Sequence, residues 1–249
     1  MFIKALPRVV VGFTRSIKYL LGRAEELNSR LVLALDILPG MKVSRGWVED
    51  LLRGLRDYVV AVKVGLPTVF ALGPDVIKGI TGEFREYYFI ADFKIADVGH
   101  VNRALCAYAD AMGFDAVIAH AVIGKVGGLD AVVNEVRSRG GAVFSLCAMS
   151  HEGAEEVLNK CFKELLRLSN EVGVDGYVLP ATKPHYIREA RELVGKDKVI
   201  LSPGVVAQGA KVGTAISYGA DFEIIGRGIY TSENPVERAR EYASRLKWR

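Results

Sequence analysis

The chain has 249 residues, of which 50% are hydrophobic and 25% charged, and its 33 basic and 29 acidic side chains leave a net charge of +4. This composition can bury a large core and excludes a disordered protein. Basic residues are scattered among acidic ones, and no run reaches the roughly 18 apolar residues that a membrane-spanning helix needs. We therefore expect a protein that binds neither nucleic acid nor membranes.

Cysteine and amide content point to the cellular setting. Cys106, Cys147 and Cys161 have no metal-ligand spacing, and their odd number argues against a disulfide framework. The N-terminal region lacks the continuous apolar stretch of a signal peptide, so we expect a cytoplasmic location. Gln208 is the only glutamine, and few thermolabile amides beside many Glu, Lys and Arg are typical of a thermophile.

Eight short apolar runs alternate with longer segments of helical periodicity. The expected strands are residues 31–37, 58–64, 87–93, 116–119, 142–146, 176–179, 199–201 and 222–225, with helices among the intervening segments at 48–56, 154–171 and 184–193. Runs that are apolar on both faces are typical of parallel strands covered by helices. Eight such repeats predict an α/β protein with a closed (β/α)8 TIM barrel. The alternative, an open doubly wound sheet, is less favoured because no Gly-x-Gly-x-x-Gly follows the first strand.

Residues 1–28 precede the first expected strand and are predicted to form an amphipathic N-terminal helical extension, with Ile17, Leu20, Leu21 and Ala24 on one side. We expect this extension to cover the bottom of the barrel, which spans residues 29–249. No linker or change of composition interrupts the chain, so residues 1–249 are predicted to form a single domain.

Charged side chains gather where the expected strands end. Asp36 and Lys63 close the first two strands, and Asp92 and Lys94 lie at the end of the third. Residues two apart on a strand share a face, so Asp92 and Lys94 point the same way, and Lys63 can meet them. A lysine held between carboxylates stays cationic, stabilises negative charge that develops on carbon and can donate a proton to it. No cluster of metal ligands is evident, so no metal is expected.

Two glycine-containing loops near the end of the chain predict a phosphate site. Gly226 and Arg227 follow the last strand, and the loop at residues 202–209 follows the seventh and contains Gln208. Barrels commonly bind phosphate at this point, through backbone N–H groups at the start of a helix. Glycine lets the backbone approach the anion, and Arg227 supplies a bidentate guanidinium.

These motifs together resemble the orotidine 5′-monophosphate decarboxylases, from residue 31 to about residue 234. The resemblance rests on Asp-x-Lys-x-x-Asp at 92–97, Met-Ser-His at 149–151, Pro-Gly-Val-Val-Ala-Gln-Gly at 203–209 and Gly-Arg-Gly at 226–228. It implies cofactor-free conversion of orotidine 5′-monophosphate (OMP) into uridine 5′-monophosphate (UMP) and CO₂, in de novo pyrimidine synthesis. It further implies a homodimer in which Asp97 reaches into the neighbouring subunit's site.

The resemblance also implies a role for each matching residue. Lys94 would stabilise and protonate the C6 carbanion, and Asp92 would lie beside the departing carboxylate. Asp36 and Lys63 would hold ribose hydroxyls, and Lys63 would also complete the alternating charge network of the catalytic residues. Ser150 would contact the pyrimidine edge, and Pro203 would shape the loop over the base. The phosphate would be bound by Gln208, Gly226 and Arg227.

Two other functions fit parts of the sequence. Hexulose-6-phosphate synthase and 3-keto-L-gulonate-6-phosphate decarboxylase share Asp92, Lys94 and Asp97, but they use Mg²⁺ and typically have Glu where Lys63 stands. A lysine there would repel the metal. A non-catalytic phosphate-binding barrel would have no reason to keep the whole charged set. Within the resemblance, Val101 replaces a usual threonine, and Val206 and Ala210 stand where glycine is common, which is expected to stiffen the phosphate loop.

Overall fold

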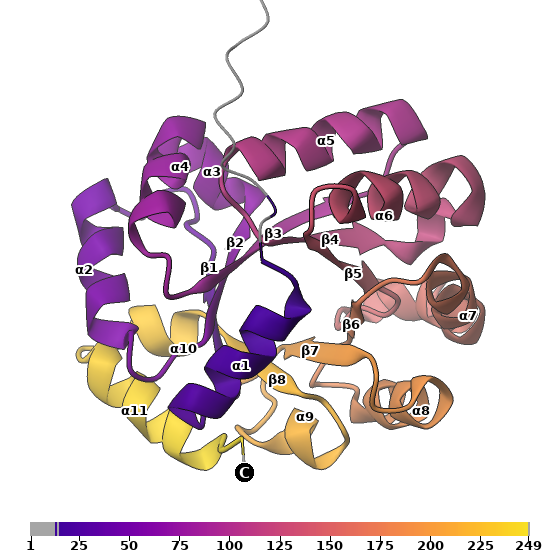
Figure 1. The fold of residues 1–249 in the computed structure, drawn as a ribbon. Helices are drawn as coiled ribbons and strands as arrows, with labels where there is room; N and C mark the ends of the chain where they lie inside the picture. Colours follow the sequence, from indigo (N-terminus) through magenta and orange to yellow (C-terminus); the bar gives the residue numbers. More distant parts are fainter. Residues whose placement is uncertain (1–12, 14, 249) are drawn as a thin grey trace, which may run out of the picture.

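The computed structural model, which describes residue 13 and residues 15–248, is a closed barrel of eight parallel strands in chain order (Figure 1). The first strand pairs with the eighth, Leu31 opposite Glu223, and this pairing closes the sheet. The predicted (β/α)8 barrel is confirmed. The strands are β1 (Leu31–Leu35), β2 (Ala61–Gly65), β3 (Tyr88–Ile95), β4 (Ala116–His120), β5 (Ala142–Leu146), β6 (Gly176–Val178), β7 (Val199–Pro203) and β8 (Phe222–Ile225).

The observed strands agree closely with the predicted ones, and β5 and β8 match at both ends. The largest difference is at β2, which was expected to begin at residue 58 but begins at Ala61. The backbone N–H groups of Tyr58 and Val59 both donate to the carbonyl of Leu55, so these residues complete the turn that follows α2 instead of joining the sheet.

Helices surround the barrel and separate successive strands (Figure 1). The α-helices are α1 (Ile17–Leu27), α2 (Arg45–Leu55), α3 (Leu66–Leu72), α4 (Pro74–Glu83), α5 (Gly99–Ala111), α6 (Asp130–Arg137), α7 (Phe162–Val172), α8 (Pro184–Val194), α9 (Thr214–Ser217), α10 (Arg227–Tyr230) and α11 (Pro235–Arg245). Shorter turns of helix are η1 (Ala121–Ile123), η2 (Lys125–Leu129), η3 (Glu152–Glu155) and η4 (Asn159–Cys161). Of the helices in the described part of the chain, none is long and apolar enough to cross a membrane.

The prediction of one continuous helix over residues 154–171 is wrong. This segment contains the end of η3, then η4, and only then the long helix α7. The side chain of Asn159 bonds to the backbone of Met149, with its Oδ1 3.0 Å from the amide nitrogen and its Nδ2 3.1 Å from the carbonyl oxygen. Side-chain bonds of this kind compete with helical backbone bonds, and here they hold the loop against the end of β5.

The N-terminal extension covers the bottom of the barrel as predicted, over the part that the structure describes. Helix α1 lies across the opening at the N-terminal ends of the strands (Figure 1). Leu20 and Ala24 are buried in the same hydrophobic cluster as Val32, Tyr88 and Phe144 of β1, β3 and β5. The helix occupies residues 17–27 of the predicted 1–28, and residues 1–12 and 14 lie outside the described residues.

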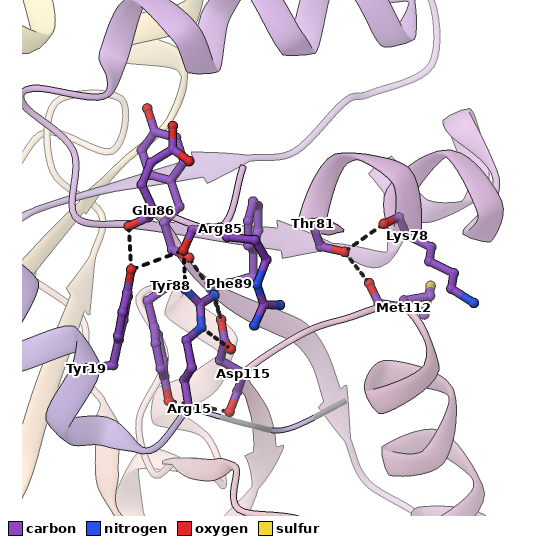
Figure 2. A network of polar contacts seen from close by, with 11 residues as sticks. Arg15, Tyr19, Lys78, Thr81, Arg85, Glu86, Tyr88, Phe89, Met112 and Asp115 are labelled. Atoms are coloured by element: carbon purple, nitrogen blue, oxygen red, sulfur yellow. Dashed lines mark hydrogen bonds and ion pairs between the residues drawn. The ribbon is translucent and has the colours of Figure 1, made fainter. Parts of the chain in front are cut away.

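A buried ion pair fastens this extension to the barrel (Figure 2). The Arg15 guanidinium contacts both carboxylate oxygens of Asp115, with Nε 2.8 Å from Oδ1 and Nη2 2.5 Å from Oδ2. Arg15 also donates to the carbonyls of Arg85 and Tyr87, and Asp115 accepts the backbone N–H of Phe89 at 2.8 Å. The segment before α1 is thereby tied to β3 and β4 at the end of the barrel opposite the charged cluster.

Candidate functional site

A cavity of about 670 Å³ lies at the C-terminal ends of the strands, where barrel enzymes place their active sites. Every predicted site residue except Asp97 lines it. The lining includes Asp36, Lys63, Asp92, Lys94, Ser150, Pro203, Gln208, Gly226 and Arg227. Residues from six strands and the loops that follow them therefore converge on one space, as the sequence analysis expected.

The charges in this cavity alternate in sign along a chain of direct contacts. Lys63 Nζ lies 3.2 Å from Asp36 Oδ2 and 2.6 Å from Asp92 Oδ2. The other oxygen of Asp92, Oδ1, lies 2.8 Å from Lys94 Nζ. The two inner side chains are nearly fully buried, whereas the side chains of Asp36 and Lys94 are 39% and 41% exposed. The outer members of the chain are thus the ones that a bound molecule can touch.

The cluster keeps its two buried members, Lys63 and Asp92, ionised. Burial opposes the charge on Lys63, but Asp92 and Asp36 outweigh it and raise the pKa of Lys63 to about 12. Burial likewise opposes the charge on Asp92, and Lys63 and Lys94 outweigh it and lower the pKa of Asp92 to about 2. Each buried charge is stabilised by two charges of opposite sign, so Lys63 and Asp92 remain charged near neutral pH.

Lys94 has a backbone conformation that the sequence pattern did not predict. Its φ is +46°, in the left-handed region, and the pairing of β3 with β4 shifts register between Ala91 and Ile95. Non-glycine residues held in this region cost free energy and cluster at functional sites. The Lys94 side chain enters the cavity beside Asp92. The two side chains therefore point the same way, as expected, although the end of β3 that carries them is distorted.

Gly65 also belongs to the site, and the sequence analysis missed it. A Cβ atom at this position would lie 2.2 Å from Asp36 Oδ1, so only glycine leaves room for the carboxylate. The carboxylate is held in that space by Lys63, and the backbone carbonyl of Asp36 accepts a hydrogen bond from the Tyr230 hydroxyl at 3.1 Å. The sequence does show this glycine directly after Val-Lys63-Val in the second strand. Its contact with Asp36 could not be read from that pattern, because Asp36 follows a different strand.

The two predicted phosphate loops lie side by side at the cavity. Gly204 has φ +99°, and Gln208 Oε1 would lie 3.1 Å from a Cβ at that position, so the glutamine folds back over its own loop. Val206 has φ +63°, an uncommon conformation for a β-branched residue, and its N–H donates to the carbonyl of Ala210 at 2.8 Å. Val206 packs closely on Gly228, next to Arg227. The valine therefore joins the two loops in a strained conformation.

Asp97 is the predicted residue that the chain does not bring to the cluster. Its side chain is exposed, and its Oδ1 accepts the N–H of Val98 at 2.7 Å. Within the described residues Asp97 forms no ion pair. The described residues also contain no group of three His, Cys, Asp or Glu side chains arranged to hold a metal ion.

Comparison with known proteins places these features in a family. The model of the family described as "Orotidine 5'-phosphate decarboxylase / HUMPS family" matches residues 29–242. An orotidine 5′-phosphate decarboxylase of Methanosarcina mazei is 37% identical over 222 residues, covering 89% of this chain and 97% of the relative. One from Thermococcus kodakarensis is 36% identical, covering 86% and 94%.

Two solved structures of orotidine 5′-monophosphate decarboxylases have folds similar to that of this chain. The orotidine 5′-monophosphate decarboxylase of Methanocaldococcus jannaschii, in complex with the inhibitor BMP, superposes with a TM-score of 0.78 at 32% identity, covering 88% of this chain and 98% of that one. The Sulfolobus solfataricus enzyme superposes with a TM-score of 0.78 at 29% identity, covering 88% and 97%.

Fold and site together define a (β/α)8-barrel enzyme whose cavity joins an alternating chain of lysines and aspartates to a pair of glycine-containing loops. The chain belongs to the orotidine 5′-phosphate decarboxylase family.

Proposed function

We propose that this protein is a carboxy-lyase that converts OMP into UMP and CO₂ without a cofactor. The observation that carries the proposal is the contact chain Asp36–Lys63–Asp92–Lys94 at the open end of the barrel. The identity of the relatives supports the same reaction. Lys63, where the Mg²⁺-dependent sugar-phosphate enzymes are expected to have Glu, favours it over that alternative.

The reaction needs a stabilised negative charge on carbon and a proton for it. Loss of CO₂ leaves the electron pair of the broken bond on C6 of the pyrimidine, and the Lys94 ammonium both faces that charge and supplies the proton that forms the C6–H bond. We place Asp92, held ionised by two lysines, beside the departing carboxylate, so that charge repulsion is relieved as CO₂ leaves. A preorganised ammonium held beside the reacting carbon stabilises such a charge strongly.

Binding of the rest of the nucleotide would supply the remaining free energy. We assign the ribose hydroxyls to Asp36 and Lys63, and the pyrimidine edge to Ser150, beneath the loop that Pro203 shapes. The phosphate contacts are assigned to Gln208, Gly226 and Arg227. Enzymes commonly lower activation barriers by as much as ~23 kcal/mol, and binding energy from a remote phosphate is one source of that reduction.

A direct assay tests the proposal. The purified protein, treated with EDTA, is expected to convert OMP into UMP, and Lys94→Ala is expected to abolish this conversion. Lys163→Ala serves as the matched control, because Lys163 is exposed on α7 and forms its ion pair with Glu189. Loss of activity on chelation, or turnover of hexulose phosphates in place of OMP, would favour the metal-dependent alternative.

The proposed enzyme is a homodimer in which Asp97 completes the partner's site. Asp97 is exposed beside the exposed apolar side chain of Val98, and Gly99 lies against Gly127 next to Val126, which is 87% exposed. An exposed acid among exposed apolar side chains fits a surface that a second copy covers. Asp97→Ala and Lys94→Ala proteins should each be inactive, and mixed dimers of the two should regain activity because one of their sites is intact. No recovery in verified mixed dimers would contradict a shared site.

We also propose a cytoplasmic location. The three cysteines are free thiols, and Cys106 and Cys147 are buried, which fits a reducing compartment. Cell fractionation of the native source tests this assignment.

A further inference from the structure

Ser150, the residue assigned to the pyrimidine edge, depends on its backbone for orientation. It lines the cavity at the C-terminal end of β5, in a loop without regular secondary structure. Among the residues that the structure describes, none forms a hydrogen bond with its hydroxyl. The position from which this side chain enters the cavity is therefore set by the backbone that carries it, beginning with the peptide that joins Met149 to Ser150.

Asn159 holds that peptide. Its side chain is buried, with the residue 3% exposed, and it does not line the cavity. Its Oδ1 accepts the N–H of Met149 at 3.0 Å, and its Nδ2 donates to the Met149 carbonyl at 3.1 Å. A side-chain amide has both an acceptor and a donor, so it can bracket one residue from both sides. Both dihedral angles that lead into Ser150 are thereby restrained.

The amide itself is anchored from the far side. Asn159 Nδ2 also donates to Glu155 Oε1 at 2.8 Å. Glu155 in turn contacts Lys183 Nζ at 2.5 Å and accepts the Tyr186 hydroxyl at 3.1 Å, so the network reaches α8 and the residue before it. Hydrogen bonds to Lys183 and Asn159 keep Glu155 ionised and lower its pKa to about 2. The loop that carries Ser150 is thus fixed to a second element of the barrel.

We propose that Asn159 is a positioning residue that orients Ser150 and so sets recognition of the pyrimidine base. This inference rests on the proposed function. It predicts that loss of the amide weakens binding of ligands that contain the base and leaves binding of the ribose phosphate part unchanged. A residue that merely stabilised the loop would have no such selectivity.

A double-mutant cycle tests the proposal. UMP and ribose 5-phosphate are titrated calorimetrically into the wild type, Asn159→Ala, Ser150→Ala and the double variant. Each single variant should bind UMP about tenfold more weakly, the loss expected for one hydrogen bond, and the double variant should be no weaker than Ser150→Ala. Affinity for ribose 5-phosphate should stay at the wild-type value in all four proteins. Asn134→Ala, at an exposed position of α6, is the matched control and should bind both ligands normally.

Two results would overturn the proposal. Additive losses, about 100-fold in the double variant, would show that Asn159 does not act through Ser150. An equal loss of UMP and ribose 5-phosphate binding would show general disorder of the loop. If Asn159→Ala does not fold, Asn159→Asp replaces it, because it keeps the acceptor for the Met149 N–H and removes the donor. A wild type that folds but neither binds UMP nor decarboxylates OMP would instead refute the proposed function.

Discussion

Lys63 and Asp92 form an ion pair buried beneath the cavity, with Nζ 2.6 Å from Oδ2 and both side chains less than a tenth exposed. Each member also contacts one half-exposed charge, Asp36 for Lys63 and Lys94 for Asp92. The buried pair therefore acts as a rigid base that fixes two opposite charges at the cavity surface. In this arrangement each of the four charges lies beside at least one charge of opposite sign.

Removal of Lys63 should damage both stability and activity. Lys63→Met leaves Asp92 buried with Lys94 as its remaining partner, so we expect a loss of about 3 kcal/mol in the free energy of unfolding, at the lower end for breaking a buried pair. Decarboxylation should fall with it, because Asp36 and Asp92 lose their common partner. Urea unfolding and an OMP assay measure the two effects. Lys163→Met, in an exposed pair, should cost less than about 1 kcal/mol, and an equal cost at both lysines would contradict the role given to Lys63.

The pH dependence of stability should reflect the lowered pKa of Asp92. Its pKa falls from 3.8 unfolded to about 2 folded, so its ionisation stabilises the fold fully above 3.8, and this contribution is lost as the pH falls through 2. The difference in unfolding free energy between wild type and Asp92→Asn should therefore be constant from about pH 8 to about pH 5 and shrink below about pH 4. Urea unfolding at each pH measures it. A difference that instead grows as the pH falls from 8 to 5 would place the folded pKa of Asp92 above its unfolded value.

The barrel and most of the charged cluster could be predicted because both depend on local patterns. Apolar runs mark buried parallel strands, and a polar residue at the end of such a run must lie at the C-terminal end of the barrel. Three features of the site could not be predicted: the left-handed conformation of Lys94, the space at Gly65 and the contacts of the Asn159 amide. Each depends on a register shift or on a contact with a residue outside its own local pattern. The periodicity of residues 154–171 was misleading for the same reason, since bonds to Met149 outweigh helical propensity there.

Gly65→Ala should displace the Asp36 carboxylate without unfolding the protein. The new methyl group would overlap Asp36 Oδ1, which sits at the end of a side chain that can rotate away from Lys63. We expect KM for OMP to rise about tenfold, as for loss of one hydrogen bond to the ribose, with a stability change below about 1 kcal/mol. Gly22→Ala in α1 is the control, because nothing lies within 4 Å of its new Cβ. It should stabilise the protein by about 0.5–1 kcal/mol with unchanged kinetics, and an unchanged KM in Gly65→Ala would refute the ribose assignment of Asp36.

Arg15→Met should destabilise the barrel and spare its activity. Asp115 would stay buried without its cation, which typically costs about 3–5 kcal/mol. Asp115 directly precedes β4, so the ion pair lies at the end of the barrel opposite the cavity, and kcat and KM at 25 °C should match the wild type. We expect one cooperative thermal transition at a lower Tm, because residues 1–249 are proposed to form one domain. Arg167→Met, in an exposed pair with Glu164, should leave Tm nearly unchanged. Two separate transitions, or lost activity in folded Arg15→Met, would contradict this prediction.

The left-handed conformation of Lys94 should make glycine more stable than alanine at this position, against the usual order. Both Lys94→Gly and Lys94→Ala remove the ammonium and should be inactive, so the electrostatic change cancels between them. A left-handed residue with a Cβ costs about 1–2 kcal/mol, which exceeds the entropic penalty of glycine, so Lys94→Gly should be about 0.5–1 kcal/mol more stable. The same pair of substitutions at Lys78, exposed on α4, should show the reverse order by about 1 kcal/mol. Urea unfolding of the four variants decides the question, and the same order at both positions would mean that Lys94 stores no backbone strain. The expected reversal would show that the fold bears this strain at the residue whose ammonium the proposed reaction requires.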